Sequence, residues 1–179
     1  MTFGTETSEY IVVDNGRIHY TRAGSGPPIL LFHPLGFSTW AWQRVTPMLG
    51  LHFTCYAFDM LGHGLSDKPS HDLSMSDFAA SMAQAMNSIG LPHAHIIGNS
   101  VGGALAAAVA ASYPHRVDKL VLVGSPVWNA RSATEFLKAD EANYDNTGMP
   151  RVRSIDDLKI LPTFVAPVQE WLDKNNESR

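Results

Sequence analysis

The sequence has little of several features that would place it in a class at once. It contains one cysteine, Cys55, so no internal disulfide can form, which fits a reducing cytoplasm. Its thirteen lysines and arginines are scattered and its net charge is −4, so no nucleic-acid partner is expected. Glycine, proline or histidine interrupts each apolar run well before about 18 residues, so no membrane span is expected.

Recognition motifs for common cofactors are also missing. Gly62-x-Gly64 lacks the third glycine of a dinucleotide fingerprint, and no Gly-Lys-Ser/Thr phosphate loop occurs. The pair His93-x-His95 has no cysteine or carboxylate close to it in sequence, so no metal site is expected there. We therefore expect neither a metal nor an organic cofactor. The first residues lack the basic and apolar regions of a secretory signal, which favours a cytoplasmic location.

What the sequence does contain is an alternation of apolar runs and helical stretches. Residues 9–13 and 17–22 flank Asp14-Asn15-Gly16, and Asn-Gly between β-rich runs predicts a hairpin. The alternation in Ile18 and Tyr20 predicts that this antiparallel pair is half exposed. Further strands are predicted at 29–32, 53–58, 95–97 and 119–124, of which 29–32 and 119–124 are apolar on both faces, like buried strands of a parallel sheet. The prediction is an α/β fold with a mostly parallel twisted sheet, an amino-terminal antiparallel hairpin and helices on both faces.

Three predicted helices connect these strands. The first covers residues 38–48, begins at Ser38 or Thr39, and has four candidate buried positions, Trp40, Trp42, Val45 and Met48. The second covers residues 77–89, with Ser76 as its cap. The third runs from Val101 to about Ser112. After Pro126 the pattern changes to helical segments with apolar faces and no further strand that is apolar on both faces.

The segment His95-Ile96-Ile97-Gly98-Asn99-Ser100-Val101-Gly102-Gly103 joins a strand to a helix through Gly-x-Ser-x-Gly. This is the sequence form of a nucleophile elbow, in which a tight turn exposes a serine hydroxyl. Glycines at its flanks remove Cβ atoms that would clash in so tight a turn. The N–H of Val101, in the first helical turn, would point toward an oxyanion formed at Ser100. A glycine-rich turn without chemistry is the alternative interpretation.

Four motifs in order over residues 9–128 resemble the α/β-hydrolase family. They are the strand end His33-Pro34-Leu35-Gly36, the loop Asp59-x-x-Gly62-x-Gly64-x-Ser66, the serine elbow, and the strand 119–124. The resemblance is to the amino-terminal half of cap-bearing members. It implies a hydrolase core over residues 1–127 and a partial helical cap over residues 128–179. The Gly-Asn-Ser-x-Gly-Gly form is similar to that of carbon–carbon bond hydrolases and related esterases.

The resemblance also implies roles for individual residues. Ser100 would be the nucleophile and would form an acyl-enzyme. The family takes one oxyanion N–H from the residue after the nucleophile, here Val101. It takes the other from the loop after the third strand, where Pro34 has no N–H, so Leu35 is the expected donor. His33 is expected near the site as a residue that braces this loop.

A catalytic acid and base are not found by the same reasoning. The family places its acid and histidine on loops after later strands, and no histidine follows His115. We therefore expect this chain to be a fragment that lacks the carboxyl-terminal half of the core. Alternatively, a short form completes its sheet as a homodimer through the edge of strand 119–124.

Two functions are compatible with these observations. The favoured one is a serine hydrolase that cleaves an ester, or a carbon–carbon bond next to a ketone, in a small hydrophobic substrate. The alternative is a non-catalytic binding protein, or an inactive short form, that keeps the fold. The intact elbow favours the first, and the missing histidine favours the second.

Overall fold

The computed structural model describes residues 6–125 of the chain, which fall in the first of two compact units, Met1–Val127. The predicted cap segment 128–179 lies outside them. The elements in chain order are β1 Thr7–Val13, β2 Gly16–Gly24, β3 Pro28–Phe32, η1 Thr39–Trp42, α1 Thr46–Leu49, β4 Thr54–Phe58, α2 Met75–Ser88, β5 Ala94–Asn99, α3 Val101–Ser112, η2 Pro114–Arg116 and β6 Val117–Val123.

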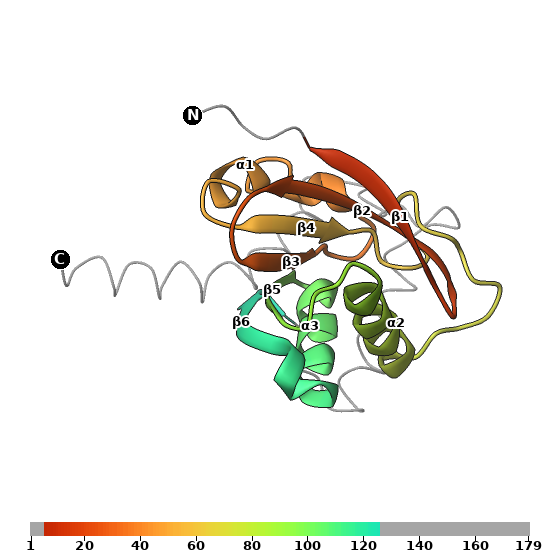
Figure 1. The fold of residues 1–179 in the computed structure, drawn as a ribbon. Helices are drawn as coiled ribbons and strands as arrows, with labels where there is room; N and C mark the ends of the chain where they lie inside the picture. Colours follow the sequence, from red (N-terminus) through yellow and green to blue (C-terminus); the bar gives the residue numbers. More distant parts are fainter. Residues whose placement is uncertain (1–5, 126–179) are drawn as a thin grey trace, which may run out of the picture. The chain divides into compact units, whose positions relative to one another are not determined.

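The six strands form one sheet in the order β1-β2-β4-β3-β5-β6 (Figure 1). Strands β4, β3, β5 and β6 are parallel to one another, while β2 is antiparallel to both β1 and β4. Val13 pairs with Gly16 at the tip of the β1–β2 hairpin, where Gly16 has a φ of +129°. The predicted α/β class, parallel sheet and amino-terminal hairpin are confirmed.

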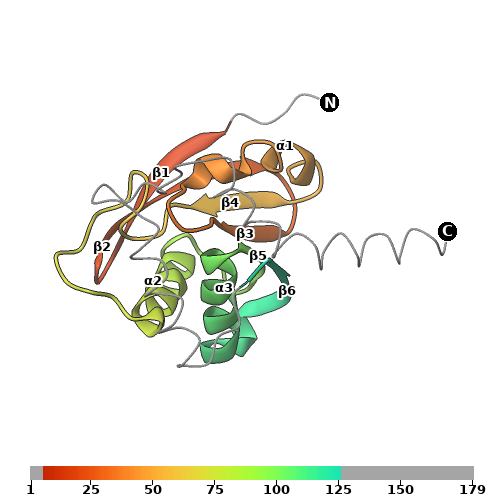
Figure 2. The same ribbon diagram turned by 180° about the vertical axis from the view of Figure 1, so that it is seen from behind.

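Helices cover the sheet on both faces, as Figure 2 shows from behind. Leu30 and Phe32 of β3 belong to the larger apolar cluster, which includes residues of α2 and α3. Ile29 and Leu31 belong to a smaller cluster that includes Trp42 of η1. Successive β3 side chains therefore enter opposite cores, which explains why this run is apolar without alternation.

Strand β2 is more buried than its sequence pattern predicted. Ile18 and Tyr20 are both buried, as is the intervening His19. Buried Ile18 and Tyr20 agree with a half-exposed pair, since Arg17 and Arg22 of the same strand are exposed, and only the burial of His19 departs from the alternation. The alternation is also seen at the carboxyl end of the edge strand β1, where Ile11 and Val13 are buried and Val12 is exposed.

The predicted helix over residues 38–48 is two short pieces. Ser38 caps η1, as expected, and its hydroxyl oxygen accepts the N–H of Trp40. Pro47 cannot donate to the carbonyl of residue 43, so a continuous helix cannot pass through it, and α1 starts afresh at Thr46. Of the four positions expected to be buried, only Trp42 is; Trp40, Val45 and Met48 are exposed.

The start of α2 also differs from the prediction. Ser74, not Ser76, is its cap, because Ser74 and Asp77 exchange side-chain-to-backbone hydrogen bonds as a capping box. Strand β6 was expected to be buried on both faces, yet its apolar residues are largely exposed because β5 is its only partner among residues 6–125. Cys55 is buried, as expected, and burial raises the pKa of its thiol to about 11.

Candidate active site

Ser100 lies in the sharp turn between β5 and α3. Its φ of +53° and ψ of −122° make it the one non-glycine residue with positive φ in the part of the chain that the structure describes. Its N–H donates to the carbonyl of Val123 at 2.8 Å, and its own carbonyl accepts the N–H of Gly103 at 2.8 Å. A strained serine held by flanking backbone bonds is the geometry that a nucleophile elbow requires.

The elbow glycines are needed because other backbone atoms lie where a Cβ would be. A Cβ on Gly98 would overlap the carbonyl oxygen of Gly102. A Cβ on Gly102 would overlap the carbonyl oxygen of Phe32 and lie 2.6 Å from that of His33. The first turn of α3 therefore packs directly on the end of β3, which brings the elbow and the loop after β3 together.

The loop after β3 contains Leu35 and is fixed at its root by His33. The His33 Nδ1–H donates to the carbonyl of Pro34 at 2.7 Å, and Nε2 accepts the N–H of Met60 at 3.0 Å. Burial lowers the pKa of His33, although its bond to the Pro34 carbonyl opposes this shift. A neutral His33 with both nitrogens engaged braces the loop and has no lone pair left to take a proton from Ser100.

Val101 and Leu35 are the residues expected to supply oxyanion N–H groups. Val101 is the first residue of α3, where helix N–H groups lack intrahelical acceptors and the helix dipole is positive. Leu35 is in the loop that His33 braces, and its side chain is exposed. Val101 directly follows Ser100, and the loop with Leu35 follows β3, the strand that pairs with β5, at the carboxyl edge of the parallel strands, where open α/β sheets bind ligands.

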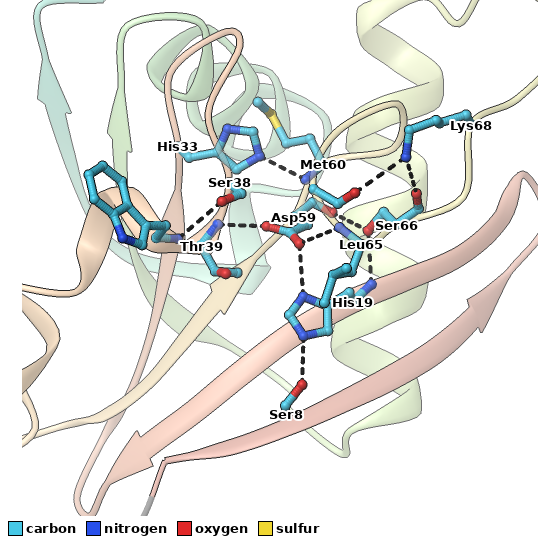
Figure 3. Close-up of polar contacts among 12 residues, drawn as sticks. Ser8, His19, His33, Ser38, Thr39, Asp59, Met60, Leu65, Ser66 and Lys68 are labelled. Carbon is cyan, nitrogen blue, oxygen red and sulfur yellow. Dashed lines mark hydrogen bonds and ion pairs between the residues drawn. The ribbon is translucent and has the colours of Figure 1, made fainter.

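A second polar cluster was not anticipated from the sequence. Asp59 follows β4, and its Oδ2 accepts the Nδ1–H of His19 at 2.8 Å, while Nε2 of His19 bonds to the hydroxyl of Ser8 at 2.8 Å (Figure 3). Within its own loop, Asp59 also accepts the N–H of Leu65 at 2.8 Å. The bond to His19 spans 40 positions and had no sequence signal.

The Ser8–His19–Asp59 cluster has the connectivity of a catalytic triad, but it does not serve Ser100. His19 lies on β2, and β4 and β3 separate β2 from β5. Three strand spacings are about 14 Å, which is far beyond hydrogen-bond reach. All eight histidines of the chain lie within residues 6–125, and no hydrogen bond there joins one of them to the Ser100 hydroxyl.

Two further findings bear on other kinds of site. His93 bonds to Asp118 at 2.8 Å on the surface, and within residues 6–125 no group of three histidine, cysteine or carboxylate side chains could hold a metal. Among the helices of the same range, none has both the length and the hydropathy needed to cross a bilayer.

Comparison with known proteins identifies relatives of this site and fold. Residues 27–149 match the family model described as alpha/beta hydrolase fold. The 2-hydroxy-6-oxo-2,4-heptadienoate hydrolase of Pseudomonas putida is 37% identical over 84% of this chain and 64% of its own length. The 2-hydroxy-6-oxononadienedioate/2-hydroxy-6-oxononatrienedioate hydrolase of Paraburkholderia phymatum is 38% identical over 97% of this chain and 63% of its own.

Solved structures of hydrolases are also similar to this chain. The meta-cleavage product hydrolase of Pseudomonas fluorescens is 33% identical, with a TM-score of 0.62 over 65% of this chain and 44% of that chain. A bacterial membrane phospholipase A is 32% identical, with a TM-score of 0.68 over 75% of this chain and 45% of that one. The curated relatives are longer proteins, and the matches to this chain span between 35% and 64% of their lengths.

Proposed function

Because the chain belongs to the alpha/beta hydrolase fold family, we propose that it is part of a serine hydrolase that acts through an acyl-enzyme on Ser100. The observation that carries this proposal is the strained backbone of Ser100, with its φ of +53° at the junction of β5 and α3. Such strain costs about 1–3 kcal/mol and persists where a site needs it, whereas an ordinary glycine-rich connection could use glycine at this position.

In the proposed reaction the Ser100 oxygen attacks the carbonyl carbon of the substrate, and the carbonyl oxygen becomes an oxyanion. The N–H groups of Val101 and Leu35 stabilise that charge, which is the step where preorganised donors have their largest effect. Collapse of the intermediate releases the leaving group and leaves the acyl group on Ser100, from which water removes it. The reaction uses no metal and no organic cofactor.

The proposed substrate is small and hydrophobic. Four large apolar side chains are exposed in the loops at this edge of the sheet: Leu35, Phe37, Trp40 and Leu65. Relatives that are 37% and 38% identical are named as hydrolases of 2-hydroxy-6-oxo acids, which supports cleavage of a carbon–carbon bond next to a ketone. An ester is the other candidate bond. The single cysteine supports a cytoplasmic location.

We infer that the catalytic acid and base are supplied by residues outside this sequence. His33 uses both of its ring nitrogens for loop contacts, and His19 is about three strands away from the elbow strand. A serine hydroxyl without a base is a weak nucleophile at neutral pH. The elbow and the oxyanion donors are still expected to give residual reactivity, since triad variants of serine enzymes keep roughly 10³-fold catalysis over water.

The test is phosphonylation by a fluorophosphonate, followed by mass mapping of the modified serine. We expect slow labelling of Ser100 that accelerates when imidazole is added as an external base and disappears in Ser100→Ala. Ser8→Ala is the matched control, because Ser8 is also bonded to a histidine and its removal is expected to leave labelling unchanged. Labelling of Ser100 no faster than in the urea-unfolded chain would contradict the proposed nucleophile.

The second candidate is a binding protein, or an inactive form, that keeps the fold without catalysis. The observation in its favour is that no histidine in residues 6–125 bonds to Ser100. A folded chain that stays unlabelled at every imidazole concentration would favour this candidate. Rapid labelling of Ser100 without imidazole would instead show that a base is present within the chain.

A further inference from the structure

The loops that follow β3 and β4 are joined by two hydrogen bonds that run in opposite directions. His33, just after β3, accepts the Met60 N–H of the second loop at 3.0 Å, and Asp59, just after β4, accepts the Thr39 N–H of the first loop at 2.6 Å (Figure 3). His33 and Asp59 are 0% and 1% exposed. The bond to His33 is buried and the bond to Asp59 is partly buried, so a shift of one loop leaves a polar group of the other poorly satisfied.

Asp59 is also linked to strands β2 and β1 by hydrogen bonds. Its Oδ2 accepts two donors, the N–H of Leu65 and the Nδ1–H of His19, both at 2.8 Å. His19 belongs to β2, and its other ring nitrogen bonds to Ser8 of β1. The carboxylate oxygens thus receive three N–H groups from β2 and from both loops, which leaves the carboxylate little freedom to move.

The loop fixed in this way is the one that contains Leu35. Pro34 and Phe37 close a turn around it, since the Phe37 N–H donates to the Pro34 carbonyl at 3.2 Å. The Leu35 side chain is 53% exposed, so apolar packing does not determine where its N–H points. The first turn of α3 lies against the root of the same loop through Gly102, so any loop movement changes the separation of the Leu35 and Val101 N–H groups.

We propose that Asp59, held by His19, is a positioning residue for the oxyanion site. Asp59 keeps the Leu35 N–H directed at the position of the oxyanion, toward which the Val101 N–H also points. This inference rests on the proposed function and adds to it: the serine elbow supplies one donor, and the Asp59–His19 pair maintains the position of the other. Donors misplaced by about 1 Å lose much of their effect on an oxyanion.

The first test compares the wild-type chain with Asp59→Asn. In asparagine one of the two accepting oxygens is replaced by an NH₂ group, which cannot accept a hydrogen bond. The variant therefore keeps either the bond from Thr39 or the bonds that Oδ2 accepts, and not both. In fluorophosphonate labelling with imidazole, we expect the saturating rate constant for Ser100 to fall about tenfold or more while the half-saturating concentration stays within about twofold. Amide hydrogen exchange of residues 34–37 is expected to accelerate, with no change in residues 104–109.

Thr39→Pro is the second variant and disturbs less of the molecule. It deletes the one hydrogen bond that Thr39 donates within residues 6–125, from the N–H that Asp59 accepts, and Thr39 is the first residue of η1, where proline is tolerated. Ser38 already has the extended backbone that precedes proline, with φ of −149° and ψ of −171°. We expect the same pattern of slower labelling and faster loop exchange, with the global unfolding transition retained.

Met86→Ala is the matched control for a general loss of stability. Met86 is fully buried in the α2 side of the core and contacts neither Asp59 nor Thr39 through a hydrogen bond. Its labelling rate and its loop exchange are expected to match those of the wild type at temperatures where both are folded. Wild-type exchange in residues 34–37 of a folded Thr39→Pro or Asp59→Asn variant would overturn the proposal.

The two readouts separate this inference from the proposed function. Hydrogen exchange of residues 34–37 does not require Ser100 to react. If the wild-type chain is never phosphonylated, the proposed nucleophile fails, and exchange alone decides whether Asp59 positions the loop. If the wild type is labelled and both variants are labelled at the wild-type rate, the proposed function survives and the positioning role is rejected.

Discussion

Strands β3 and β6 have similar apolar sequences and lie in one sheet, yet their environments differ. Leu30, Leu31 and Phe32 of β3 are 0% exposed, whereas Leu120 to Val123 of β6 are 37–48% exposed. Strand β3 is bonded on both sides and covered on both faces, while β6 is bonded to β5 alone among the described strands. The comparison shows that an apolar run predicts a strand, and that its neighbours decide how much of it is buried.

The largest expected effect comes from truncating matched leucines in these two strands. Leu30→Ala is expected to lower the free energy of unfolding by about 3 kcal/mol, because it leaves a cavity in the closed core. Leu122→Ala is expected to cost about 1 kcal/mol or less, since that side chain is already half in solvent. Urea unfolding followed by circular dichroism measures both, and equal costs would contradict the comparison.

The glycines near the same two strands should differ next. Gly102→Ala is expected to destabilise the chain by about 2 kcal/mol, because the added Cβ meets the backbone carbonyls of Phe32 and His33, which cannot move aside cheaply. Gly124→Ala, after β6, meets nothing within 4 Å and loses only about 1 kcal/mol through its positive φ of +55°. The measurement is the thermal unfolding temperature of both variants. A larger loss for Gly124→Ala than for Gly102→Ala would show that the α3–β3 contact is loose.

The exposed edge of β6 gives a third expected difference. Among residues 6–125 no strand pairs with the outer edge of β6, and an apolar strand edge without a partner invites pairing with another chain, so we expect homodimers at high concentration. Val121→Lys is expected to shift sedimentation toward the monomer while changing the free energy of unfolding by only about 0.5 kcal/mol. Val12→Lys, on the opposite edge strand β1, is the control. If Val12→Lys dissociated the dimer and Val121→Lys did not, β6 would not be the strand that forms the dimer interface.

The smallest expected effect concerns pH and the buried end of β3. Burial lowers the pKa of His33 from its ordinary 6.5, so the unfolded chain binds a proton more readily than the folded one. The stability that the neutral form contributes is complete above about pH 6.5 and is lost as the pH falls toward the folded pKa. His33→Gln is expected to flatten the loss of stability between pH 7 and pH 5, measured by urea unfolding. An unchanged slope would contradict the neutral, buried histidine.

Much of the fold could be predicted because its signals are local. The Asn-Gly hairpin, the doubly apolar β3 and the glycine-flanked elbow each follow from a few adjacent residues. The single helix predicted over 38–48 was wrong because Pro47, which is present in the sequence, interrupts it. The cap of α2 was predicted at Ser76 and is Ser74. A capping box needs a partner side chain three positions after the cap, and Asp77 stands at that position for Ser74.

The elbow and the His33 brace of the candidate site could be predicted, whereas the contacts of Asp59 could not. Gly-x-Ser-x-Gly is a continuous motif, so Ser100 and Val101 were found from the sequence. The contacts of Asp59 join residues 20 and 40 positions away, and no spacing rule links Asp59 to Thr39 or to His19. Their association depends on β2, β3 and β4 lying side by side, in an order that the chain does not follow.

The sequence by itself determined which segments are strands, where the chain turns sharply, and which serine occupies that turn. These properties depend on backbone preferences and on side chains within a few positions of one another. The tertiary structure alone decided that His19 and Asp59 meet, and how much of β6 is exposed. Such outcomes arise when distant segments compete for the same hydrogen bonds and the same apolar surface, and that competition is settled only once the sheet has assembled.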